Sequence, residues 1–134
     1  MKFLTGEWLK SADSDIETIG EIIDNATLTH VVAFHSHQCI EKCFKAVLEE
    51  YEIETPKIHN LITLYESVHG ILQIELNRAA LKKLNELYID SRYPSDLGLM
   101  PYGKPTGKDA QEFFEFAKMV YSKIKQLLGM VDLV

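Results

Sequence analysis

Apolar residues recur along most of the chain at spacings of three and four positions, the period of an amphipathic α-helix. The first such stripe covers 8–26 and fades into a polar break at about 25–29. The second covers about 31–51 and ends before Thr55-Pro56, because the residue preceding a proline is pushed out of the helical region. The pattern therefore predicts two long helices in the first half of the chain.

The second half continues the same periodicity in shorter pieces. One stripe covers 58–70, with its end expected near Gly70, and another covers about 74–89. Segment 92–107 holds three prolines and three glycines, which excludes regular helix and predicts a long loop. A final stripe over 110–127 predicts the last helix.

The start of this last helix is marked by Thr106 and Asp109, which have the spacing of a capping box. No segment alternates with period two for long enough to predict a strand. The sequence thus predicts an all-α fold, an antiparallel bundle of four to five helices. A chain of 134 residues fits a single domain, 1–134.

Composition indicates in which cellular environment the protein works. The chain is 46% hydrophobic and 25% charged, and no apolar run approaches the roughly 18 residues that span a bilayer, so no membrane association is expected. Near the N-terminus, Glu7 interrupts any apolar run that would predict a secretion signal. Cys39 and Cys43 are too few for a disulfide framework, which favours a reducing, cytoplasmic location.

The net charge of −6 argues against a freestanding nucleic-acid binder, since non-specific affinity comes from Lys and Arg neutralising phosphates. The only arginines are Arg78 and Arg92. Any RNA contact is therefore expected to be local, or to be assembled by two copies of the chain, and no DNA binding is expected.

Polar residues of the second predicted helix form a stripe of their own. Gln38, Glu41, Lys42 and Lys45 stand at i, i+3, i+4 and i+7, so they share one face. A phosphate could dock on this face. The alternative is a solvated surface with a Glu41–Lys45 ion pair worth a few tenths of a kcal/mol.

Arg92 and the histidines also have two interpretations each. Arg92 could bind phosphate, or it could complement a helix dipole and tie down the loop. His35, Cys39 and Cys43 recur every four residues, but this ladder is unlike structural zinc sites, so neither metal nor cofactor is expected. His59 follows a proline break, where capping or a buried hydrogen bond is the simpler role.

Four pieces of the sequence together resemble the HEPN family (higher eukaryote and prokaryote nucleotide-binding domains). Segment 34–46, FHSHQCIEKCFKA, resembles the family's histidine and glutamine followed by Glu-Lys and Lys-Ala. His59-Asn60-Leu61 with Leu64 is similar to its His-x-Leu-x-x-Leu element, and 88–94 resembles its Arg-Tyr-Pro signature. Asp109-Ala110 resembles the start of its last helix.

This resemblance implies a helical bundle that usually dimerises and often acts beside a minimal nucleotidyltransferase in toxin–antitoxin pairs. For this chain it implies a homodimer with such a partner. It also implies that Arg92, Lys42 and Lys45, with Gln38, bind the phosphate of a nucleotide or RNA.

The chain departs from the family's metal-independent ribonucleases, whose motif is arginine, four to six residues, then histidine. The matching positions after Arg92 and Arg78 hold no histidine, and none follows His69. RNA cleavage needs a base that titrates near neutral pH and a cation for the charge on phosphorus.

Three interpretations therefore stand beside one another: a phosphate-binding protein, a metal-independent RNA endonuclease, and a structural interaction module without ligand. In the second, His35 or His59 replaces the missing histidine and Arg92 supplies the cation. Whether the protein is an enzyme stays open at this stage.

Overall fold

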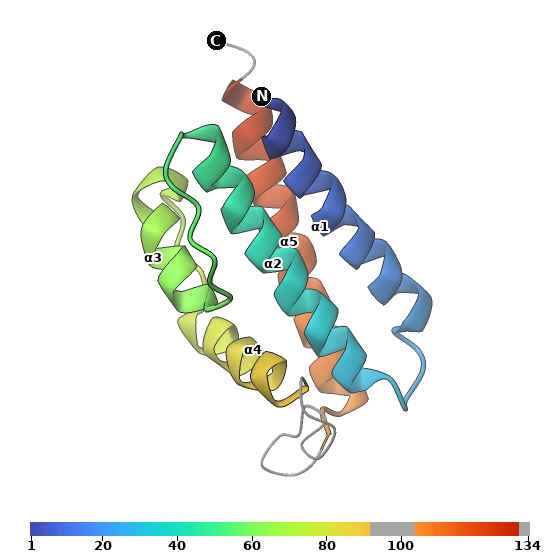
Figure 1. The fold of residues 1–134 in the computed structure, drawn as a ribbon. Helices are drawn as coiled ribbons and strands as arrows, with labels where there is room; N and C mark the ends of the chain where they lie inside the picture. The colour runs from blue at the N-terminus through green and yellow to red at the C-terminus, as the bar shows by residue number, and fades with distance from the viewer. Residues whose placement is uncertain (92–103, 132–134) are drawn as a thin grey trace.

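A computed structural model of the chain describes residues 1–91 and 104–131, and within them all regular structure is helical (Figure 1). The helices are α1 (Phe3–Ile22), α2 (Thr29–Glu50), α3 (Leu61–Leu72), α4 (Arg78–Ser91) and α5 (Gly107–Val131). The prediction of an all-α bundle is confirmed. Most of the predicted loop 92–107 lies outside the described residues.

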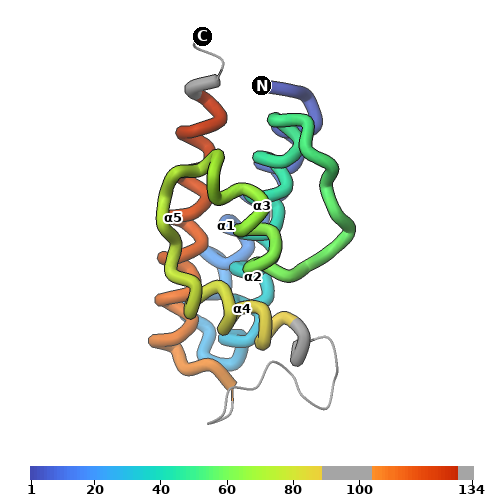
Figure 2. Tube along the Cα trace, turned by 90° about the vertical axis from the view of Figure 1, so that its left-hand side faces the viewer, coloured from blue at the N-terminus to red at the C-terminus, as the bar shows by residue number. Residues whose placement is uncertain are grey.

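The central element is α2, which contacts each of the other four helices. The long helices α1 and α5 lie along it, and the shorter α3 and α4 cover its remaining flank (Figures 1 and 2). Directions in the bundle are mixed: α1 runs opposite to α2, whereas α5 runs the same way as α2 (Figure 1). The extended segment 51–60 carries the chain back along α2 before α3 begins (Figure 1).

Because α2 is surrounded, its polar as well as its apolar side chains are buried. Its core residues include Val32, Ala33, Cys39, Ile40, Cys43, Phe44, Ala46, Val47 and Leu48. Its buried polar or charged residues are Thr29, Ser36, His37, Glu41 and Lys45. Polar groups removed from water need hydrogen-bond or charge partners, so these residues are expected to bond to side chains of the elements that surround α2.

The first helix begins and ends earlier than its apolar stripe predicts. Helix α1 begins at Phe3. Its start is held against the end of α2, because the Lys2 backbone N–H donates to Glu50 Oε1 at 2.8 Å. It ends at Ile22 because Asn25 Oδ1 accepts from the Thr27 backbone N–H at 2.9 Å, which stabilises a turn in place of further helix.

The helices α3 and α4 also differ from their predicted bounds. The α3 helix starts after Asn60, whose side chain caps its first turn, and it continues past Gly70 to end where Gln73 takes φ 53°. The α4 helix begins at Arg78 rather than near Ile74, since the Tyr65 hydroxyl donates to the Ile74 carbonyl and accepts from the Leu76 N–H, each at 2.9 Å.

The capping box of α5 is confirmed. Thr106 Oγ1 accepts from the Asp109 backbone N–H at 3.0 Å, and Asp109 Oδ2 accepts from the Thr106 backbone N–H at 2.8 Å. Among the described residues, no helix has both the length and the apolarity needed to cross a bilayer.

Candidate functional site on the central helix

The predicted polar stripe of α2 contacts both α1 and the segment before α3, because Lys42 bonds to Asp15 and Glu41 bonds to His59. Figure 1 shows α1 and the extended segment 51–60 on either side of α2. Two groups of charged side chains cover this stripe. Both combine a buried carboxylate, a histidine and a lysine, and both contain residues that the sequence predicted as site residues.

The first group, here called the Asp15 cluster, joins α1 to α2. Asp15 is buried, and its Oδ1 accepts from His35 Nδ1 at 2.8 Å. Its Oδ2 accepts from Lys42 Nζ, also at 2.8 Å. Because the His35 and Lys42 side chains are 25% and 20% exposed, the carboxylate is shielded while both of its donors reach solvent.

The second group, the Glu41 cluster, joins α2 to the segment before α3. Glu41 is buried, and its Oε2 accepts from Lys45 Nζ at 2.9 Å. Its Oε1 accepts from His59 Nδ1 at 3.0 Å. The Lys45 ammonium also lies 5.7 Å from the centre of the Trp8 ring, so this lysine is enclosed, whereas the His59 side chain is half exposed.

A third histidine, His37, is fully buried between α2 and α4. Its ring stacks on Tyr88 at 4.1 Å between centres, and neither ring nitrogen has a hydrogen-bond partner of ordinary geometry among the described residues. Burial lowers the pKa of His37 to about 4, although Glu41 and the nearby backbone of His59 and amide of Asn85 oppose the shift. His37 is therefore neutral near pH 7.

Aromatic contacts connect the two clusters. The ring of Phe34 lies 5.3 Å from His35 and stacks on Tyr88 at 5.6 Å. Tyr88 in turn lies 5.5 Å from the ring of His59. These ring contacts link His35 to His59 through Phe34 and the buried Tyr88. Arg92 follows Tyr88 by four residues in the sequence.

The backbone beside His59 is held by α4. Asn85 Oδ1 accepts from the Leu61 backbone N–H at 2.8 Å, and its Nδ2 donates to Asn60 Oδ1 at 3.0 Å. Asn60, not His59, is the helix cap. His59 makes a hydrogen bond to Glu41, but this bond is part-buried rather than buried as predicted, because the His59 side chain is half exposed.

The structure brings His35, Lys42, Lys45 and His59 together around two carboxylates. The predicted Glu41–Lys45 ion pair is confirmed, but both residues are buried rather than solvated. Gln38 is half-buried on the same face, and its side chain has no hydrogen-bond partner in the part of the chain that the structure describes. Arg92 lies outside the described residues.

Sequence reasoning did not find Asp15, His37 or Tyr88 as members of this site. A signal for Asp15 was present, because it stands three residues after Ala12 and four before Ile19, within the apolar stripe of α1. A carboxylate on such a stripe requires a buried partner. His37 and Tyr88 lie within the segments that resemble the HEPN family, but the sequence did not predict their contact, which depends on how α4 packs against α2.

The chemical consequence of both clusters is a fixed histidine orientation. A carboxylate accepts hydrogen bonds, so Nδ1 of His35 and of His59 is the donor. The Nε2 atom of each ring is then left to accept a proton when the ring is neutral, or to donate one when it is charged. This arrangement suits contact with a phosphate and suits proton transfer.

The ladder of His35, Cys39 and Cys43 divides in the fold. His35 bonds to Asp15, whereas both cysteines are buried in the core. Burial raises the pKa of the Cys43 thiol, which keeps it protonated, and the thiolate is the form that binds metals.

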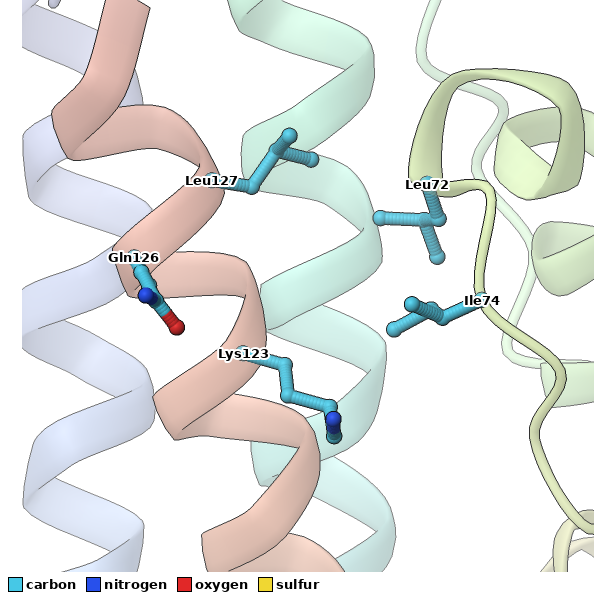
Figure 3. A pocket seen from close by; sticks show the side chains of 5 residues that line it. All are labelled: Leu72, Ile74, Lys123, Gln126 and Leu127. Carbon is cyan, nitrogen blue, oxygen red and sulfur yellow. The ribbon is translucent and has the colours of Figure 1, made fainter.

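A separate hollow of about 200 Å³ lies between α5 and the end of α3, with α2 behind it (Figure 3). It is lined by Leu72, Ile74, Lys123, Gln126 and Leu127. None of these residues belongs to either cluster, so the hollow is not part of the candidate site.

Comparison with family models supplies the decisive observation. The model of the HEPN domain matches residues 5–127, which include most of α1 and of α5 and all of α2, α3 and α4. The chain belongs to the HEPN family. The resemblance read from segments 34–46, 59–64 and 88–94 is thereby confirmed, and membership of the HEPN family points to a nucleotide- or RNA-related function. Searches of curated proteins and of solved structures gave no match.

Proposed function

We propose that this HEPN protein binds the phosphate of a nucleotide or an RNA on the polar face of α2. The residues assigned to this role are Lys42, Lys45, Gln38 and Arg92. The observation that carries the proposal is the pair of carboxylate-held histidines, each of which shares its carboxylate with one of these lysines. Such a surface concentrates cationic donors in a chain of net charge −6.

The two lysines do not contribute equally to this proposal. Lys42 is one-fifth exposed and can reach a ligand while it stays near Asp15. Lys45 is 8% exposed and bonded to Glu41, so a direct contact requires its ammonium to turn away from a buried carboxylate. Lys42 is therefore the stronger candidate for direct phosphate contact.

Arg92→Ala is expected to weaken binding of a labelled oligouridine by about 1–3 kcal/mol, the range for losing a charge-assisted hydrogen bond, without lowering the melting temperature. A titration and a thermal unfolding curve on the same variant measure both. The matched control is Arg78→Ala, because Arg78 pairs with Glu66 at 3.2 Å and lies over the Tyr65 ring, within α3 and α4. A lower melting temperature with unchanged binding makes Arg92 a structural clamp and contradicts its assignment.

The proposed partners are a second copy of the chain and a minimal nucleotidyltransferase, in a toxin–antitoxin pair. Both partners follow from the family resemblance. In a homodimer, the polar faces of the two α2 helices would belong to one assembly. Sedimentation equilibrium of the protein alone, and of its mixture with a nucleotidyltransferase encoded beside it, tests both. A 15 kDa species in each sample contradicts them.

A second candidate function is metal-independent RNA cleavage. It is favoured by the Glu41–His59 hydrogen bond, which orients a half-exposed histidine as a general base. In this reaction His59 removes the 2′-hydroxyl proton, the 2′-oxygen attacks phosphorus and the 5′-oxygen leaves. Arg92 is the proposed cation for the charge that develops on the phosphate.

Incubation of RNA with the protein in excess chelator tests this activity. If the protein cleaves RNA, His59→Asn is expected to lower the rate about 10²–10⁴-fold, the usual contribution of a positioned base. The control is His69→Asn, since His69 is held by the exposed Glu75 at 2.7 Å and does not touch either cluster. Equal loss in both variants, or no cleavage by the unmodified protein, argues against the endonuclease.

A further inference from the structure

The hollow between α5 and the end of α3 has an apolar half and a polar half (Figure 3). Leu72, Ile74 and Leu127 supply the apolar half, and all three belong to the hydrophobic core or pack against it. Lys123 and Gln126 supply the polar half, and both lie on α5. A single ligand in the hollow would therefore contact apolar side chains and a positive charge at once.

The polar half of the hollow has donors to spare. Within the described part of the chain, Lys123 has no carboxylate partner and the Gln126 amide has no hydrogen-bond partner. Other lysines of α5 are engaged, since Lys118 pairs with Glu115 at 3.0 Å. An unpaired ammonium beside apolar side chains, in a chain of net charge −6, favours an anionic ligand.

Bonds within the chain hold the apolar half in place. Gln73, between Leu72 and Ile74, has φ 53°, a left-handed conformation that residues other than glycine seldom adopt. The Tyr65 hydroxyl holds the residues that follow, through its bonds to the Ile74 carbonyl and the Leu76 N–H. A hollow that is already formed binds a ligand without the cost of ordering a loop.

The size of the hollow limits the ligand that it holds. Its volume of about 200 Å³ is below the roughly 300–1,000 Å³ of ordinary small-molecule and cofactor sites. A cavity of about 150 Å³ accommodates benzene. The hollow therefore suits one ring or one branched chain that carries a single charged group.

The surroundings of the hollow favour a free small molecule over a protein partner. Among the described residues, the large apolar side chains that are exposed lie on segments 1–4 and 51–53, and none of them lines the hollow. A stable protein interface buries about 1,000 Å² or more. These exposed side chains do not extend the hollow into an apolar surface of that kind.

We propose that the hollow binds a small apolar carboxylate, with its ring or branched chain against Leu72 and Leu127 and its carboxylate at Lys123. The Gln126 amide is a second donor to the carboxylate. The proposal goes beyond the phosphate-binding function and does not depend on it, because no residue of the hollow belongs to the Asp15 or Glu41 cluster.

The test uses phenylacetate as the probe, titrated near pH 7 into isotope-labelled protein and followed through the backbone amide shifts. Two further ligands divide the interaction: phenylacetamide retains the ring without the charge, and acetate retains the charge without the ring. The variant is Lys123→Gln. The matched control is Lys125→Gln, an exposed lysine of the same helix that lies beside the Tyr121 ring and outside the hollow.

We expect phenylacetate to shift the amides of Leu72, Ile74, Lys123 and Leu127. It is expected to bind about three- to fivefold more tightly than phenylacetamide, the upper range for an exposed ion pair. Acetate is expected to cause no localised shifts at the hollow. Lys123→Gln should remove the preference for phenylacetate, and Lys125→Gln should retain it.

Equal binding of phenylacetate and phenylacetamide to the unmodified protein overturns the inference, because the hollow then selects no charge. Equal loss of the preference in both lysine variants also overturns it, since the net charge of α5 would then be the cause. Shifts centred on α2 place the carboxylate elsewhere, and shifts that weaken as the protein concentration rises show that a second copy covers the hollow. Either of these results overturns the inference as well, and none of the four contradicts the phosphate binding that the oligouridine titration measures.

Discussion

Replacement of Glu41 by alanine is expected to lower the free energy of unfolding by about 3–5 kcal/mol, the cost of leaving a buried charge without its partner. Lys45 is 8% exposed and bonds to Glu41 at 2.9 Å, and its ammonium lies 5.7 Å from the centre of the apolar Trp8 ring. The loss of Glu41 strands the Lys45 ammonium in the protein interior. Urea unfolding measures the change through the transition midpoint at constant slope.

Two further variants separate this effect from ordinary loss of contacts. Glu115→Ala removes another Glu–Lys ion pair, with Lys118, but those side chains are 58% and 42% exposed, so only a small loss of stability is expected. Glu41→Leu combined with Lys45→Met removes both charges and is expected to recover most of the stability lost in Glu41→Ala. A loss below about 1 kcal/mol in Glu41→Ala would show that Lys45 reaches water.

This pair also shows what the sequence alone predicts well and poorly. The i, i+4 spacing of Glu41 and Lys45 predicts their contact, and the structure confirms it. The spacing assigns only a few tenths of a kcal/mol to this ion pair, because an i, i+4 separation by itself does not say whether the pair is buried. In the structure, segment 51–60 and α1 lie against this side of α2 and bury the pair. The loss of stability expected when Glu41 is removed is therefore about tenfold larger than for an exposed pair.

The helices themselves follow from local patterns, but their ends depend on distant side chains. The apolar stripes and the Thr106–Asp109 box predict the all-α fold and the start of α5. The late start of α4 depends on the Tyr65 hydroxyl, which bonds to the backbone 9 and 11 residues away. Such contacts form only after α3 and the following segment have packed together.

Some residues of the candidate site can likewise be predicted from the sequence, whereas others are found only in the folded structure. His35, Lys42, Lys45 and His59 are identified from their residue types and from the HEPN pattern. The carboxylate Asp15, which holds two of them, comes from α1 and is found only when α1 and α2 are placed side by side. The role of Arg92 stays a prediction, because it lies outside the described residues.

The second large effect is expected from His37 when the pH is lowered. The pKa of His37 in the folded protein is lowered to about 4, mainly because burial disfavours the charged ring, while an unfolded histidine has a pKa of 6.5. Below pH 6.5 the unfolded chain therefore takes up a proton that the folded chain does not. Stability from neutral His37 is fully present above pH 6.5 and declines as pH falls towards 4, by about 3 kcal/mol in total.

His37→Phe isolates this contribution, because phenylalanine retains the stacking on Tyr88 and cannot titrate. Near pH 7 the stability of the variant is expected to match or exceed that of the unmodified protein. The substitution removes two buried ring nitrogens that have no hydrogen-bond partner among the described residues. Between pH 6.5 and 4 the gap in unfolding free energy should widen by about 3 kcal/mol in favour of the variant.

Carboxylates titrate in the same range in both proteins, so the difference between their urea curves, not either curve alone, reports His37. A constant gap for His37→Phe would mean that the folded protein protonates His37, with Glu41 as a counter-charge at 3.8 Å.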